Sequence, residues 1–100
     1  MSGYRFTNKA VEDLTQIWNY TIIKWSENQA DIYYNMLLEN CQELSRKPGL
    51  GKDYSEITQN LLGIKAGRHI IFYRRIEGNK IEIIRIPLGL MDLKKRIKEK

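Results

Sequence analysis

Basic side chains and a single histidine are the residues of this chain whose types suit chemistry on a phosphate or binding of an acidic group. Arg68 and His69 begin one strand-like run, which also holds Tyr73 and Arg74, and Arg85 lies in the next such run. A guanidinium binds phosphates or carboxylates through two parallel hydrogen bonds. Histidine titrates near neutral pH. Neighbouring strands that carry Arg74 and Arg85 therefore predict a surface for phosphates or for a carboxylate-rich peptide.

Catalysis asks more of these residues than binding does. Cleavage of RNA requires one group that takes the 2′-hydroxyl proton and another that protonates the leaving oxygen. His69 and the arginines can be assigned these roles, but their spacing does not require it, and a strand-end histidine bonded to backbone is the simpler interpretation of His69. One histidine and one cysteine do not supply a metal site. The chain has no nucleophile motif, and "GLGK" is too short for a phosphate-binding loop. We therefore expect no catalytic residue, no metal and no cofactor.

Length and charge limit the class of protein. The chain has 100 residues, so we expect one domain over residues 1–100. A net charge of +5 favours acidic partners, although solubility alone also explains it. No apolar run approaches the roughly 20 residues that span a bilayer, and the N-terminal residues do not resemble a secretory signal. With one cysteine, Cys41, these features predict a cytoplasmic protein without disulfides or membrane contact.

The first half of the chain predicts a helical hairpin. Thr7 and Ser26 have the character of helix N-caps, and "SENQ" has the form of a capping box. Apolar residues between Asn8 and Trp25 recur at helical spacing, and a second such stripe continues to Leu44. Pro48 and the glycines beside it end the second helix. We interpret both stripes, which include Trp18 and Trp25, as core packing.

The second half predicts strands. Residues 61–67, 68–75 and 80–86 are rich in β-branched and aromatic residues, with a turn at Gly78 and Asn79. They form an antiparallel meander, which the segment "YRFT" can join. Both hairpin strands are apolar on more than one face, so the sheet should pack on the helices and also meet something on its other side. The fold class is therefore α+β: an N-terminal strand and an antiparallel helical hairpin on a small, twisted antiparallel sheet, with a short C-terminal tail.

Five strings in this order resemble the ParE-type toxins of the RelE/ParE superfamily, from bacterial type II toxin–antitoxin systems. The resemblance covers almost the whole chain. It implies the same α+β fold, in which a helical hairpin packs on a strongly twisted sheet. The strings are "YRFTNKAVEDLTQIWNYT", "QADIYYNML", "KPGLGKDYSEI", "GRHIIFYR" and "IEIIRI" followed by "MDL".

The resemblance implies a toxin that inhibits DNA gyrase, with the A subunit as target, without catalysis. It also implies a cognate antitoxin whose C-terminal segment folds on binding. No sequence-specific contact with nucleic acid is expected. A superfamily alternative is a ribosome-dependent mRNA endonuclease, but Ile70 stands where such enzymes carry an arginine in the signature strand. The candidate residues for contact with target or antitoxin are Trp18, Trp25, Arg68, His69, Tyr73, Arg74, Arg85, Leu88, Leu90, Met91 and Asp92.

The main departure from the family pattern is near the C-terminus. Where ParE-like chains read "RILHxRMD", this chain has Pro87, Leu88 and Leu90 in place of the leucine, histidine and arginine. Pro87 removes a backbone donor, so the strand should end there or lie on an edge. If the missing histidine and arginine contact the target, toxicity is reduced. A third interpretation is therefore a detoxified protein that retains only antitoxin binding.

Overall fold

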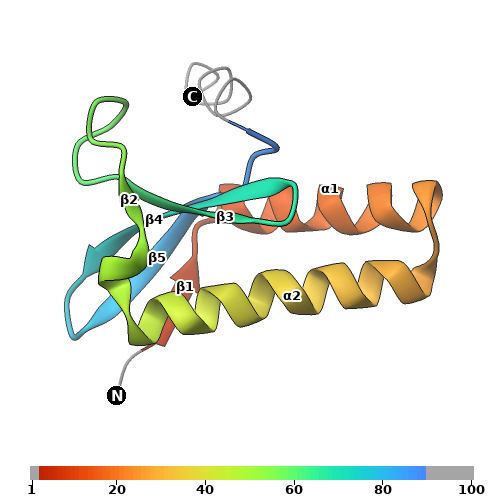
Figure 1. Cartoon of the computed structure of the whole chain (residues 1–100), viewed down its shortest axis with the longest axis horizontal. Coiled ribbons are helices and arrows are strands. Elements are labelled where there is room, and N and C mark those ends of the chain that lie inside the picture. Colours follow the sequence, from red (N-terminus) through yellow and green to blue (C-terminus); the bar gives the residue numbers. More distant parts are fainter. Residues whose placement is uncertain (1–2, 90–100) are drawn as a thin grey trace.

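The structure is a computed structural model that describes residues 3–89, and it confirms the α+β class. Five strands form one sheet in the order β1-β5-β4-β3-β2 (Figure 1). The later strands pair antiparallel, whereas β1 pairs parallel with β5, so the sheet is mixed. The elements are β1 (Gly3–Phe6), α1 (Asn8–Lys24), α2 (Glu27–Arg46), η1 (Pro48–Leu50), β2 (Lys52–Asp53), β3 (Leu62–Ala66), β4 (His69–Ile76) and β5 (Lys80–Arg85).

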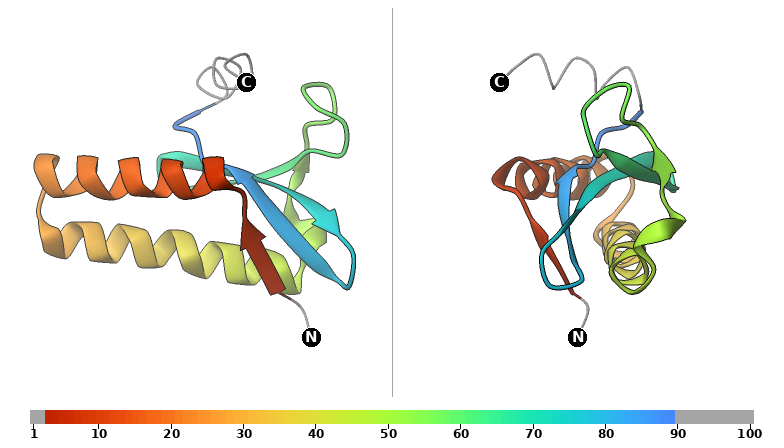
Figure 2. Two further views of the ribbon diagram at one scale, coloured as in Figure 1. Left: turned by 180° about the vertical axis from the view of Figure 1, so that it is seen from behind. Right: turned by 90° about the vertical axis from the view of Figure 1, so that its left-hand side faces the viewer.

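The helical hairpin begins at the two predicted caps. The Thr7 hydroxyl accepts from the Ala10 N–H at 3.1 Å, and the Ser26 hydroxyl accepts from the Gln29 N–H at 3.0 Å. Only Trp25 and Ser26 separate the helices. The helices therefore run antiparallel side by side, and both extend past the end of the sheet (Figures 1 and 2). Neither helix of residues 3–89 is long and apolar enough to cross a membrane.

The core lies between the hairpin and one face of the sheet. It consists of apolar side chains from α1, α2, β4 and β5, among them Ala10, Leu14, Ile17, Leu37, Cys41, Leu44, Ile71, Tyr73, Ile81 and Ile83. Burying one large aliphatic side chain contributes about 1.5–3 kcal/mol, so these contacts dominate the stability of the fold. The prediction of a single core stripe was wrong for Val11, Ile22 and Trp25, which are exposed. Val11 and Ile22 lie on the exposed side of α1, and Trp25 lies just beyond its C-terminal end.

The opposite face of the sheet is partly covered by the chain itself. Residues 54–61 connect β2 to β3 and place Tyr54, Ile57 and Leu61 against Phe72. The Tyr54 and Phe72 rings meet edge to face, with centroids 5.1 Å apart. This loop stands out from the sheet in Figure 2. The prediction that the second apolar face of the sheet is also covered is therefore confirmed, and the covering segment is residues 54–61 of the same chain.

Tyr73 ties the end of the helical hairpin to the sheet. Its buried hydroxyl donates to the Pro48 carbonyl at 2.7 Å and accepts from the Gly51 N–H at 2.8 Å. A Cβ on Gly51 would lie 2.1 Å from that hydroxyl oxygen, so a side chain there displaces the ring. Burial raises the pKa of Tyr73, which keeps the hydroxyl protonated as a donor at neutral pH.

The buried thiol of Cys41 predicts a specific loss of stability at alkaline pH. Burial raises its pKa from 9.0 to about 12. A group whose pKa is higher in the folded than in the unfolded state stabilises the fold fully at pH values below its unfolded pKa. This stabilisation is lost as the pH rises through the folded pKa. Relative to Cys41→Val, the wild type should lose about 1.4 kcal/mol by pH 10. Urea unfolding of both proteins at pH 8 and pH 10 measures this, and equal losses would contradict it.

Candidate functional site

A groove of about 560 Å³ lies between the two helices, the β3–β4 turn and the segment that follows β5. This volume is within the range of about 300–1,000 Å³ that is typical of ligand sites. Its surface is mostly apolar by area, although six of its 13 lining residues have polar or charged side chains. The lining residues are Asp13, Gln16, Ile17, Tyr20, Thr21, Trp25, Gln29, Tyr33, Gly67, Arg68, His69, Ile86 and Leu88, and this set is called the groove below.

Tyr33 of α2 positions one wall of the groove. Its hydroxyl accepts from the backbone N–H of Arg68 at 2.9 Å and lies 2.6 Å from Nδ1 of His69. With its oxygen accepting from Arg68, the Tyr33 O–H is available to donate to Nδ1 of His69. Burial raises the pKa of Tyr33, partly opposed by Arg68. The turn that carries Arg68 is thereby fixed to the helical hairpin.

Asp13 of α1 positions the other wall. Its carboxylate is only 2% exposed and accepts from Nε and Nη2 of Arg85 and from the Ile86 N–H, at 2.9–3.0 Å. The Ile70 N–H donates to the Pro87 carbonyl at 3.0 Å. β5 ends at Arg85, as predicted from Pro87. These bonds fix residues 85–87 and so place Leu88, which is 60% exposed, at the groove.

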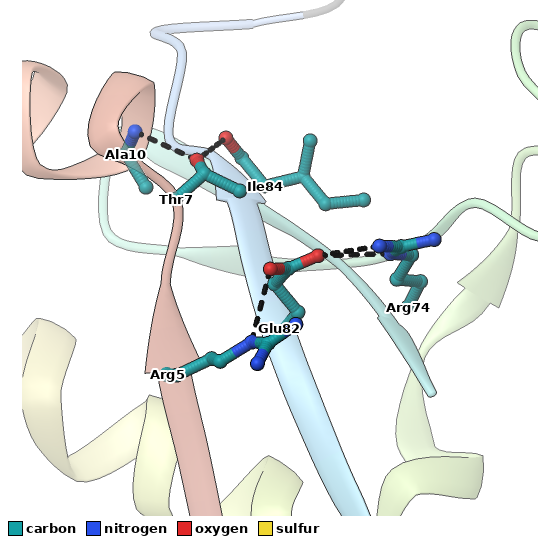
Figure 3. A network of polar contacts seen from close by, with 6 residues as sticks. All are labelled: Arg5, Thr7, Ala10, Arg74, Glu82 and Ile84. Atoms are coloured by element: carbon teal, nitrogen blue, oxygen red, sulfur yellow. Dashed lines mark hydrogen bonds and ion pairs between the residues drawn. The ribbon is translucent and has the colours of Figure 1, made fainter. Parts of the chain in front are cut away.

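A second polar cluster lies on the sheet face that points away from the helices. Nε of Arg5 donates to Oε2 of Glu82 at 3.1 Å, and Nε of Arg74 donates to Oε1 at 2.9 Å (Figure 3). Burial alone would raise the pKa of Glu82, but Arg74 and Arg5 together outweigh burial, so the pKa is lower than usual. One carboxylate is thus shared by two arginines from the strands on either side of it.

Four of the predicted site residues meet in the groove: Trp25, Arg68, His69 and Leu88. Tyr73 lies in the core instead, and Trp18 packs edge to face on Tyr34 with ring centroids 5.7 Å apart. Leu90, Met91 and Asp92 lie outside the described residues. In the part of the chain that the structure covers, no three side chains of His, Cys, Asp and Glu gather closely enough to hold a metal ion.

The predicted surface that joins Arg74 and Arg85 is wrong. Side chains alternate between the faces of a strand, so Arg85 shares a face with the core residue Ile83, and Arg74 lies on the face opposite to the core residue Tyr73. Arg85 therefore turns to the helices and binds Asp13, whereas Arg74 stays on the opposite face with Glu82. The two guanidiniums cannot hold the same phosphate.

Sequence reasoning missed Asp13 and Tyr33, which position the groove. Asp13 had a detectable signal, since a carboxylate between Ala10, Leu14 and Ile17 lies on the buried stripe of α1 and needs a buried partner. Tyr33 had none, because its bonds to Arg68 and His69 cross 35 and 36 positions of the chain.

Comparison with known proteins gives one consistent result. A family model described as "ParE toxin of type II toxin-antitoxin system, parDE" matches residues 4–93. Toxin ParE1 of Caulobacter vibrioides is 31% identical over 86 residues, which are 86% of this chain and 88% of that protein. Toxin ParE1 of Mycobacterium tuberculosis is 27% identical over 96 residues, which are 96% of this chain and 98% of that protein.

Solved structures resemble this fold. The chromosomal ParDE toxin–antitoxin system from P. aeruginosa matches with a TM-score of 0.72 and 19% identity, over 86% of this chain and 94% of that chain. The toxin–antitoxin complex RelBE2 from Mycobacterium tuberculosis matches with a TM-score of 0.64 and 20% identity, over 85% of this chain and 94% of that chain. At these identities the likeness shows the fold alone.

Proposed function

We infer that this chain, which belongs to the ParE toxin family of type II toxin–antitoxin systems, inhibits DNA gyrase without catalysis and is silenced by a cognate antitoxin. The observation that carries the proposal is the family match over residues 4–93, because it includes every described element of the fold. The toxin would act in the cytoplasm on the gyrase A subunit, as a single domain over residues 1–100.

Non-catalytic action is supported by what the candidate catalytic groups already contact. Nδ1 of His69 lies at hydrogen-bond distance from the Tyr33 hydroxyl, and two nitrogens of Arg85 bind the buried carboxylate of Asp13. Ile70, in the signature strand, can neither move a proton nor stabilise charge on a phosphate. Among residues 3–89, these contacts favour groups that hold the fold together over groups aimed at a substrate.

A supercoiling assay with purified gyrase tests the proposal. Supercoiling should be lost at a molar excess of toxin and restored when the antitoxin encoded beside it is added. A parallel reaction with ribosome-bound mRNA provides the alternative outcome. Full gyrase activity together with cut mRNA would replace the proposal with the endonuclease function. If neither target is affected but the antitoxin binds tightly, the detoxified interpretation is correct.

The groove is the surface that we propose for the antitoxin. Trp25 is 62% exposed and Leu88 is 60% exposed, and they line the same hollow. Large apolar side chains of this kind supply most of the free energy of a protein interface. The solved neighbours named above are a ParDE system and a RelBE2 complex, which supports an antitoxin partner.

Replacing Leu88 with glutamate should weaken antitoxin binding by about tenfold or more, because a carboxylate would be buried without a partner. Titration calorimetry measures the dissociation constant. Ile32→Glu is the matched control, since Ile32 is 55% exposed on α2 but does not line the groove. Equal effects of the two substitutions would move the antitoxin away from the groove.

A further inference from the structure

The sheet face that points away from the helices is open beside β1. Register places Arg5 and Arg74 on either side of Glu82, and Gly3 and Ile76 on either side of Lys80. Because side chains two positions apart on a strand share a face, Lys80 lies on the same face as Glu82. A Cβ on Gly3 would meet no atom of residues 3–89 within 4 Å, so no described segment packs on the sheet at that position. Arg5, Arg74, Lys80 and Glu82 are called the open sheet face below.

This face carries more positive charge than its own carboxylate neutralises. Three cations surround one glutamate. The side chains of Arg5 and Arg74 are 64% and 51% exposed, whereas that of Glu82 is only 12% exposed. A guanidinium has five N–H donors. The Glu82 carboxylate binds Nε of Arg5, and it binds Nε and Nη2 of Arg74. Each arginine therefore keeps donors for a second anion, and the two approach Glu82 from opposite strands (Figure 3).

We propose that the open sheet face binds the phosphate backbone of nucleic acid without reading its sequence. Cations alone supply most of the free energy of such binding. An acidic protein segment is the weaker fit, because protein interfaces depend on buried apolar anchors. The groove provides such anchors, whereas the four residues of the open sheet face are all charged. The proposal does not depend on gyrase inhibition.

The test compares two double substitutions that remove the same charge. Arg5→Ala with Arg74→Ala changes the open sheet face. Arg46→Ala with Lys47→Ala is the matched control, because these two cations also share one carboxylate, that of Glu43 at the end of α2. Fluorescence anisotropy with a duplex DNA oligonucleotide, and with single-stranded RNA, measures affinity from about 50 to 200 mM salt, where backbone contacts have their largest effect.

The open-face variant should bind duplex DNA about tenfold or more weakly at low salt. The slope of log affinity against log salt should become shallower by about 2, since each phosphate contact contributes about 0.9. The control should keep the wild-type slope. Equal losses in both variants, or no loss in either, would overturn the proposal, because charge elsewhere in the chain would then explain the binding.

Glu82→Gln provides a gain of binding that a loss of structure cannot mimic. It removes the carboxylate that competes with phosphate while both arginines remain, so duplex DNA should bind several-fold more tightly. Unchanged or weaker binding would count against the site. A polyglutamate peptide of matched charge is the final arm. If it binds as tightly as DNA and loses affinity equally in the open-face variant, the partner is an acidic protein and the nucleic-acid proposal fails.

Discussion

Replacing Asp13 with alanine is expected to lower the free energy of unfolding by about 3–5 kcal/mol, because it removes the buried carboxylate to which Arg85 binds. The Asp13 carboxylate accepts from Arg85 and from the Ile86 N–H inside the fold. Its removal leaves a guanidinium whose side chain is only 13% exposed, together with an unpaired backbone donor. Urea denaturation at pH 7 measures the change. A loss below about 1 kcal/mol, the usual value for a surface pair, would show that the pair is not effectively buried.

A double substitution separates the charge from the backbone bond. Asp13→Leu with Arg85→Met removes both charges and leaves side chains of similar volume, which is often close to neutral for a buried pair. Because the Ile86 N–H still loses its acceptor, a residual cost of about 1–3 kcal/mol should remain. If the double variant is as unstable as Asp13→Ala, the lost backbone bond explains the effect and the ion pair does not.

Replacing Gly67 with alanine is expected to cost about 2–4 kcal/mol, from backbone strain and overpacking together. Gly67 has a φ of +60°, and a Cβ there would lie 2.8 Å from Tyr33 and 2.9 Å from Met36. The turn and the Tyr33 ring cannot both keep their positions. The bonds from Tyr33 to Arg68 and His69 should then lengthen, and the groove should lose one wall.

Gly78→Ala is the matched control for this prediction. Gly78 also has a positive φ, +75°, but a Cβ there would meet nothing within 4 Å. It should therefore show only the backbone cost of about 1–2 kcal/mol. Thermal unfolding gives both values, and antitoxin affinity should fall only for Gly67→Ala. If the two variants are equally stable, the contact of the Gly67 position with Tyr33 does not add to the cost of the substitution.

Local chemistry explains why much of the fold was predictable. Thr7 and Ser26 cap helices through side chains that bond only three residues ahead, so the sequence around each cap was sufficient. The turn at Gly78 and Asn79 was predictable for the same reason, because both residues adopt positive φ. The parallel pairing of β1 with β5 was not, since it joins residues at opposite ends of the chain.

The groove was predicted only in part, and the reason is again distance along the chain. Trp25, Arg68, His69 and Leu88 were candidates because of residue type or family pattern, but nothing local indicated that they meet. Arg74 and Arg85 lie on neighbouring strands, but alternation puts them on opposite faces, since Arg85 is two positions from the core residue Ile83 and Arg74 is next to the core residue Tyr73. The sequence did not say which face of the hairpin packs on the helices, and that choice decides which guanidinium turns inward.

The pairing of β1 with β5 also has a consequence for synthesis on the ribosome. β1 is among the first residues to emerge, yet its hydrogen-bonded neighbour, Lys80–Arg85, is translated only after every other described strand and helix. The helices can form locally before that, but contacts so distant along the chain form slowly and late. A nascent chain that stops before β5 lacks the strand that joins β1 to β4 in the sheet. The sheet of this ParE-family chain is therefore expected to be completed only after β5 has been translated.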